Sequence, residues 1–129
     1  MKLSNLLANI EYTVINDGNP EITDIIYDSR KVTDGTAFVC LKGYTSDGHK
    51  YAQSAVEKGA AALIISDDLS FDVPKNVAVI KVENTRKALA YISAEFFCRP
   101  AEKLKTIAIT GTKGKTTTTA MIASILECA

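Results

Sequence analysis

Residues 110–117, with the sequence TGTKGKTT, constrain the fold of this chain more than any other stretch. The apolar, β-branched run at 105–109 predicts a buried strand before them, and the run at 118–129 predicts a helix after them. A strand, a glycine loop ending in Gly-Lys-Thr and a helix form the phosphate-binding arrangement of nucleoside triphosphatases. The sequence therefore predicts a phosphate-binding loop in an α/β fold.

Each residue type in this loop suits a bound triphosphate. Glycine has no Cβ, so main-chain N–H groups near Gly111 and Gly114 are able to turn inward around a phosphate. The start of the following helix adds a partial positive charge and unpaired N–H donors. Lys115 can reach the outer phosphates and is the catalytic candidate, and the Thr116 hydroxyl is the candidate ligand of Mg²⁺. The predicted ATP-binding residues are Gly111, Thr112, Lys113, Gly114, Lys115, Thr116 and Thr117.

The match to the general phosphate-loop pattern departs at one position. That pattern has a glycine five residues before Gly114, where this chain has Ile109 and instead carries its extra glycine at Gly111. An ordinary glycine-rich turn with a solvated lysine is the alternative interpretation. The strand and helix predicted on either side favour the phosphate loop.

The position of the loop in the chain also matters. A phosphate-binding domain needs further strands, an acidic partner for Mg²⁺ and a nucleoside pocket. Even one strand–helix–strand unit takes roughly 30 residues, and only about a dozen follow the loop. We therefore expect an N-terminal piece of a longer protein, cut inside its second domain and inactive by itself.

Composition argues against several classes of protein. Fifteen basic and 15 acidic residues give a formal net charge of zero, which disfavours a general binder of nucleic acid or anionic membranes. We expect no signal peptide, and no stretch is long enough to span a bilayer. Three widely spaced cysteines without a neighbouring histidine favour reduced, mostly buried thiols in a cytoplasmic protein over disulfides or a zinc site. They are Cys40, Cys98 and Cys128.

Strand and helix patterns alternate along the first 100 residues. Helical spacing of apolar residues predicts a first helix at 3–10, and a second is predicted at 51–58 with Gly59 as its cap. A third is predicted from Asn84 or Thr85 to near Pro100. Strands are predicted at 12–15, 22–27, 37–41, 60–65 and 77–82. This alternation predicts an α/β fold with a mixed or partly parallel sheet.

Several short motifs in this region resemble a known family. They are DSRKV at 28–32, GTAFV at 35–39, KGYTSDGH at 42–49, Ala55 and GAA at 59–61. Together with the phosphate loop, and in this order, they resemble the Mur ligases, and among these the UDP-N-acetylmuramoyl-tripeptide synthetase type. The resemblance covers essentially the whole chain, and two separate motif sets are more specific than either alone.

The resemblance implies a division of labour along the chain. Residues 1–100 would form a UDP-substrate-binding domain, 101–103 a linker, and 104–129 the start of a truncated central domain that binds ATP and Mg²⁺. The full-length enzyme would phosphorylate the terminal carboxylate of a UDP-N-acetylmuramoyl-peptide in peptidoglycan synthesis. The amine of an amino acid, selected by a C-terminal domain, would then attack the acyl phosphate.

The resemblance also implies which residues bind the UDP moiety. They are Tyr27, Ser29, Tyr44, Thr45 and Ser46. Hydroxyl groups suit a diphosphate because they donate hydrogen bonds, and a tyrosine ring can stack on uracil. One departure is Lys113, where the family usually has asparagine; a second lysine there adds positive charge beside the phosphates.

Each of these features also has a simpler structural interpretation. Residues 28–30 also read as a strand-end turn with a local salt bridge, and 43–48 as a flexible loop. His49 is expected as a loop or helix-start residue rather than a catalyst. The whole chain is alternatively a non-catalytic UDP-sugar-binding or interaction module with a vestigial nucleotide loop. The presence of both Lys115 and Thr116 favours the enzyme.

Overall fold

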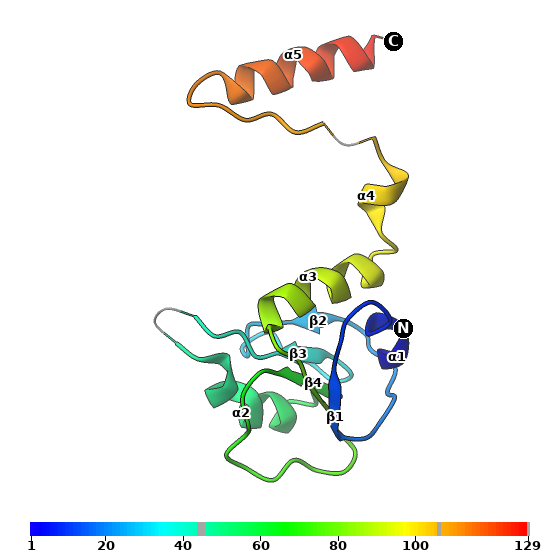
Figure 1. The fold of residues 1–129 in the computed structure, drawn as a ribbon, viewed down its shortest axis with the longest axis vertical. Coiled ribbons are helices and arrows are strands. Elements are labelled where there is room, and N and C mark those ends of the chain that lie inside the picture. The colour runs from blue at the N-terminus through cyan, green and yellow to red at the C-terminus, as the bar shows by residue number, and fades with distance from the viewer. Residues whose placement is uncertain (44–45, 106, 129) are drawn as a thin grey trace. The chain divides into compact units, whose positions relative to one another are not determined.

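The computed structural model describes residues 1–43, 46–105 and 107–128. The chain divides into two units, Met1–Arg99 and Pro100–Ala129, and Figure 1 shows the path of the chain through both. Tyr44 and Thr45, two of the predicted UDP-binding residues, lie outside the described residues, as does Thr106 in the predicted strand before the phosphate loop.

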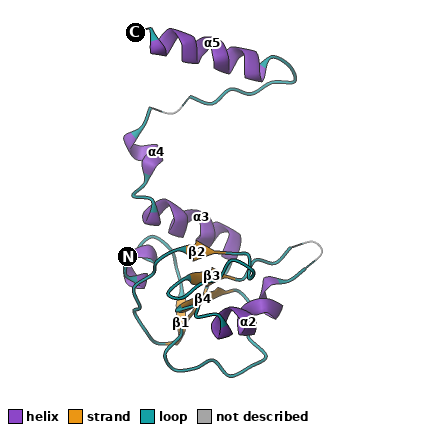
Figure 2. Cartoon of the chain, turned by 180° about the vertical axis from the view of Figure 1, so that it is seen from behind, coloured by secondary structure: helices purple, strands orange, loops and turns teal. Residues whose placement is uncertain are grey.

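A five-stranded mixed sheet forms the first unit (Figures 1 and 2). Its strands are β1 (Thr13–Asn16), β2 (Ile25–Ile26), β3 (Ala37–Val39), β4 (Ala62–Ile65) and β5 (Ala78–Lys81). They lie in the order β1-β5-β4-β3-β2, with β2 to β5 parallel and β1 antiparallel to β5. The predicted α/β fold with a mixed sheet is therefore confirmed.

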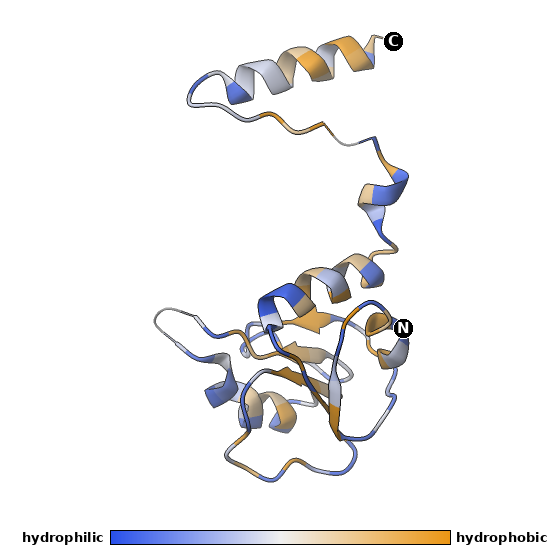
Figure 3. Ribbon diagram, viewed as in Figure 1, coloured by the Kyte–Doolittle hydropathy of each residue, from blue (hydrophilic) through white to orange (hydrophobic). Residues whose placement is uncertain are grey.

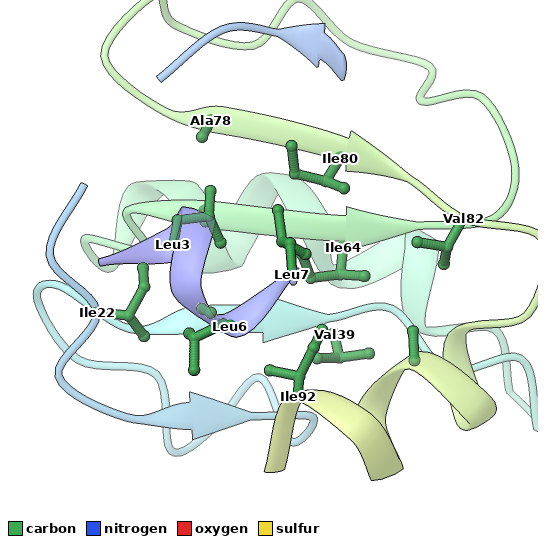
Figure 4. Close-up of a cluster of buried hydrophobic side chains, with 13 residues drawn as sticks. Leu3, Leu6, Leu7, Ile22, Val39, Ile64, Ala78, Ile80, Val82 and Ile92 are labelled. Carbon is green, nitrogen blue, oxygen red and sulfur yellow. The ribbon is translucent and has the colours of Figure 1, made fainter. Parts of the chain in front are cut away.

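The central strands are apolar because both faces of the sheet are covered. Val39, Ile64 and Ile80 contribute to the hydrophobic cluster on one face. Figure 4 shows this cluster between the strands and the helices α1 (Leu3–Leu6) and α3 (Thr85–Phe96). The residues that directly precede these three in the chain are Phe38, Leu63 and Val79. They contribute to the cluster on the other face, together with α2 (Ala52–Glu57). This alternation follows from the two-residue period of a strand.

The start of α3 and the end of α2 coincide with residues that favour a helix cap. The Asn84 side chain accepts hydrogen bonds from the main-chain N–H groups of Arg86 and Lys87, so it is the N-cap of α3. A 3₁₀ turn, η1 (Gly48–Tyr51), precedes α2. After α2, Gly59 has a φ of 98°, the left-handed conformation expected of a helix-ending glycine.

One predicted strand is much shorter than its pattern suggests. Only Ile25–Ile26 of the residues at 22–27 form β2, at the edge of the sheet. The main-chain N–H of Ile22 instead donates to the carbonyl of Met1 at 2.7 Å, and its side chain is buried in the cluster shown in Figure 4. Because Ile22 is hydrogen-bonded to the N-terminal residue, the start of this run does not pair with the sheet.

The second unit contains α4 (Pro100–Lys103) and α5 (Lys115–Glu127). The residues expected as a linker, 101–103, form a helical turn that starts at Pro100. Proline suits the first position of a helix because the N–H group that it lacks would have no partner within the helix. The predicted strand at 105–109 is wrong for the residues described, since 105 and 107–109 are not in a strand. A strand needs a hydrogen-bonded neighbour, and the described part of this unit contains none.

Helix α5 exposes apolar side chains. It begins at Lys115, three residues before the predicted start, and buries none of its described residues. Met121, Ile125 and Leu126 are each more than 60% exposed, and Figure 3 shows the apolar colour concentrated in the C-terminal half of this helix. The described part of α5 therefore leaves apolar side chains exposed.

All three cysteines are free thiols in the structure; Cys40 is buried, whereas Cys98 and Cys128 are exposed. The expectation of mostly buried thiols is therefore wrong. Burial raises the pKa of the Cys40 thiol to about 12, which disfavours the reactive thiolate form. Within the described residues, no helix combines the length and the apolar character needed to cross a membrane.

Candidate functional site

A cavity of about 490 Å³ lies at the carboxyl ends of β2 and β3 in the first unit. Parallel strands present their carboxyl ends along one edge, where α/β proteins bind ligands. The cavity is lined by Tyr27, Asp28, Ser29, Arg30, Leu41, Gly43, Ser46, Gly48 and Tyr51. Three predicted residues, Tyr27, Ser29 and Ser46, therefore meet at one cavity from two separate segments.

Asp28 and Arg30 hold the turn that carries Ser29. The Asp28 carboxylate accepts from the main-chain N–H of Arg30 at 3.0 Å and from its guanidinium at 2.9 and 2.7 Å. These hydrogen bonds hold the pKa of Asp28 well below its usual value. The local salt bridge of the plainer interpretation is thus present, and it forms part of the cavity wall.

Ser46 lies in the second arm of a hairpin whose two described arms are residues 41–43 and 46–48. The N–H of Gly43 donates to the carbonyl of Ser46 at 2.9 Å, and the N–H of Gly48 donates to that of Leu41 at 2.8 Å. A Cβ at Gly48 would lie 2.7 Å from the main-chain nitrogen of Leu41, so only glycine fits. The described part of this loop is therefore a hydrogen-bonded hairpin rather than a loose connection.

Cationic side chains surround this hairpin and turn. Arg86 donates to the carbonyl of Lys42 at 3.3 Å, and the Lys42 ammonium pairs with Asp67 at 3.2 Å. Lys58 donates to the carbonyl of Ser29 at 2.7 Å. Arg30 lines the cavity and is paired with Asp28, whereas Lys58 and Arg86 bind main-chain carbonyls of the turn and the hairpin, so they place positive charge near both segments. Sequence reasoning missed Lys58 because it lies 29 residues from Ser29.

The predicted phosphate loop lies in the second unit. Gly114 has a φ of 79° and is the N-cap of α5, and Gly111 has a φ of 150°. The first helical hydrogen bond runs from Thr118 N–H to the Gly114 carbonyl at 2.9 Å. The N–H groups of residues 115–117 are therefore left at the helix start without partners in the helix ladder.

The residues of this loop fit a triphosphate with Mg²⁺. An added Cβ at Gly114 would meet nothing within 4 Å, so space does not require a glycine there. Glycine is favoured because the backbone is left-handed at this position. The Lys115 ammonium folds over the loop and donates to the carbonyl of Gly111 at 2.5 Å. Thr116 is exposed in the first turn of α5. Lys115 would neutralise outer phosphates, and the Thr116 hydroxyl would ligate the metal.

An α/β sheet with a cavity at its carboxyl edge defines a class of ligand-binding proteins, and sequence comparison identifies the family within it. Residues 21–97, more than half of the 129-residue chain, match the family described as Mur ligase family, catalytic domain. The chain belongs to the Mur ligase family. The matched segment includes every described residue that lines the cavity.

Curated relatives carry a more specific name. The chain is 49% identical over 129 residues to the UDP-N-acetylmuramoyl-L-alanyl-D-glutamate--2,6-diaminopimelate ligase of Clostridium perfringens, and 45% identical over 128 residues to that of Clostridium botulinum. Each alignment covers 98% of this chain and 26% of the relative. The chain thus spans about a quarter of the length of these relatives.

Solved structures show the same fold. MurF from Acinetobacter baumannii superposes with a TM-score of 0.75 at 33% identity, over 96% of this chain and 27% of that one. MurF from Thermotoga maritima in complex with ADP superposes with a TM-score of 0.54 at 28% identity, over 74% and 21% of the two chains.

Proposed function

We propose that the chain forms the UDP-binding domain and the start of the ATP-binding domain of an ATP-dependent ligase. That enzyme would add an amino acid to a UDP-N-acetylmuramoyl-peptide in peptidoglycan synthesis. The observation that carries the proposal is the meeting of Tyr27, Ser29 and Ser46 at one cavity beside cationic side chains. Family membership and the relatives' names support it.

The cavity offers suitable groups to each part of a UDP moiety. Tyr27 is 63% exposed and presents a ring on which uracil can stack. The hydroxyls of Ser29 and Ser46 donate hydrogen bonds to the diphosphate, and Arg30 adds positive charge. Tyr44 and Thr45, next to Ser46 in the chain, complete this proposed set.

The phosphate loop would hold ATP and Mg²⁺. The residues for this task are Gly111, Thr112, Lys113, Gly114, Lys115, Thr116 and Thr117. ATP supplies the phosphoryl group that converts the precursor's carboxylate into an acyl phosphate, from which the amine displaces phosphate to form an amide. Within this chain, Lys115 would neutralise the outer phosphates and the Thr116 hydroxyl would ligate the metal.

The relatives' names suggest the two other substrates. We propose UDP-N-acetylmuramoyl-L-alanyl-D-glutamate as the acceptor and 2,6-diaminopimelate as the amino acid. The exposed free thiols of Cys98 and Cys128 support a cytoplasmic location, because such thiols persist in a reducing compartment.

Release of ADP by the enzyme that contains this chain tests the proposal. We expect ADP only when both the UDP-muramoyl dipeptide and the amino acid are present. Ser29→Ala should raise KM for the UDP substrate more than KM for ATP. ADP release that ignores the UDP substrate would overturn the proposal, and UDP-sugar binding without any ATP turnover would indicate the non-catalytic module instead.

A further inference from the structure

His49 lies at the base of the hairpin that carries Ser46, and its side chain is only 8% exposed. Its Nδ1 lies 2.6 Å from Oδ1 of Asp47. Its Nε2 accepts hydrogen bonds from the main-chain N–H groups of Ser66 at 3.0 Å and Asp67 at 3.2 Å. Both ring nitrogens are therefore engaged by the protein.

These contacts define the tautomer of the ring. Nε2 faces two N–H donors, so it has to present a lone pair and carries no proton. The single proton of the neutral ring is then on Nδ1 and is donated to Asp47. The same carboxylate oxygen accepts the main-chain N–H of His49 at 3.0 Å, which caps η1. The hydrogen bonds from His49 lower the pKa of Asp47 and keep this acceptor ionised.

The ring joins two parts of the chain that are otherwise separate in sequence. Ser66 and Asp67 directly follow β4, which lies in the middle of the sheet with all four residues buried. Ser46 and Gly48, which line the cavity, directly flank Asp47. The imidazole thus links the second arm of the hairpin to the main chain just after β4, a fully buried strand at the centre of the sheet.

We propose that His49 is a positioning residue for the UDP-binding cavity. By bridging Asp47 to the N–H groups after β4, it fixes the place of Ser46 and Gly48 against the turn that carries Ser29. This inference rests on the proposed function, because it takes UDP as the ligand of the cavity.

A metal site is the competing interpretation of this cluster. Ligand atoms of Asp47, His49 and Asp67 lie within 4.8 Å of one another. However, Nε2 of His49 already accepts two main-chain hydrogen bonds, and the Asp67 carboxylate pairs with Lys42 at 3.2 Å. A cation would have to displace all of these contacts, so the cluster is better explained as a structural fastening.

Two substitutions separate the functions of the two ring nitrogens. His49→Gln can place an amide oxygen near the position of Nε2 and keep the acceptor for Ser66 and Asp67, whereas His49→Asn keeps only a donor near Nδ1. UDP titrated into the ¹⁵N-labelled 129-residue chain gives the dissociation constant from amide shifts. We expect His49→Asn to weaken UDP binding about 10-fold, equivalent to about 1.4 kcal/mol, and His49→Gln to restore most of it.

Asn16→Ala is the matched control. Asn16 also makes two side-chain hydrogen bonds to the main chain, to the carbonyls of Pro74 at 3.0 Å and Val77 at 2.6 Å, near the amino end of β5. This variant should lower thermal stability without changing UDP affinity. A folded His49→Asn chain that binds UDP like the wild type overturns the inference alone. A wild-type chain that does not bind UDP overturns the proposed function as well.

A measurement on the wild type keeps the inference testable if His49→Asn does not fold. His49 is the chain's single histidine, so its ring ¹⁵N signals need no assignment. We expect a protonated Nδ1 and an unprotonated Nε2, and a shift of both signals when UDP binds. A ring protonated on Nε2, or one that is insensitive to UDP, overturns the inference.

Discussion

The ammonium of Lys58 donates a hydrogen bond to the main-chain carbonyl oxygen of Ser29 over 2.7 Å. Lys58 is the C-cap of α2, and Ser29 lies in the turn after β2. The contact engages a carbonyl that would repel an anion and places a positive charge behind the cavity wall. One side chain therefore holds the turn and would favour the diphosphate that we propose binds there.

We predict that Lys58→Met weakens UDP binding several-fold and that added salt narrows the difference from wild type, because salt screens an exposed charge. Thermal stability should change little, since Lys58 is exposed. Lys75→Met, which removes an exposed lysine from the loop before β5, is the control. Equal UDP affinities of the two variants would contradict this account of Lys58.

The pairing of Asp28 with Arg30 predicts a specific dependence on pH. The pKa of Asp28 is lowered in the folded chain, chiefly by the hydrogen bond from the Arg30 side chain. Its stabilising contribution is therefore present above the ordinary value of 3.8 and is lost as the pH falls through the lowered value. Carboxyl carbon shifts followed against pH should show a midpoint well below 3.8, which Arg30→Ala should move back toward 3.8. A midpoint that Arg30→Ala leaves unchanged would show that the pair does not hold the turn.

Gly59→Ala should destabilise the first unit by more than about 1 kcal/mol. The residue has a φ of 98°, and an added Cβ would lie 2.9 Å from the Asp34 carboxylate and 3.0 Å from the Asp34 Cα. Urea unfolding of the chain measures the loss. Gly18→Ala is the control, because Gly18 has no left-handed φ and the nearest atom to an added Cβ would be 3.3 Å away. This substitution should lower the free energy of unfolding by less than Gly59→Ala does. A larger loss for Gly18→Ala would refute the steric argument.

Hydrogen exchange should differ sharply between α5 and β4. Helix α5 buries none of its described residues, whereas all four residues of β4 are buried between two hydrogen-bonded strands. Because isolated helices of this length are marginal in water, amides of α5 should exchange much faster than those of β4 in a dilute monomer. Slow exchange across α5 under those conditions would show that this helix is stabilised by contacts we have not identified.

Local signals in the sequence predicted the elements whose causes are local. The cap at Asn84 and the glycine that ends α2 were readable because a side chain or a missing Cβ acts within a few residues. The strand at 105–109 was not predicted correctly, since an apolar run becomes a strand only beside a partner strand.

The residues of the candidate site were predicted from the family resemblance, whereas the contacts that hold them in place were not. The resemblance predicted that Tyr27, Ser29 and Ser46 bind one UDP moiety, and the structure brings these three residues to one cavity. The contacts that hold them are long-range: Lys58 is 29 residues from Ser29, and His49 is 17 residues from Ser66. Nothing in a local pattern records such pairings.

UDP binding to the ¹⁵N-labelled chain tests the central claim most directly. The account predicts that shift changes cluster at residues 27–30 and 46–48, and that Ser29→Ala weakens binding while Lys115→Ala leaves the affinity intact. The Lys115 variant matters because a diphosphate is also able to occupy a phosphate loop. Shift changes confined to residues 111–117, abolished by Lys115→Ala and indifferent to Ser29→Ala, would contradict the claim that the cavity beside Ser29 binds the UDP moiety.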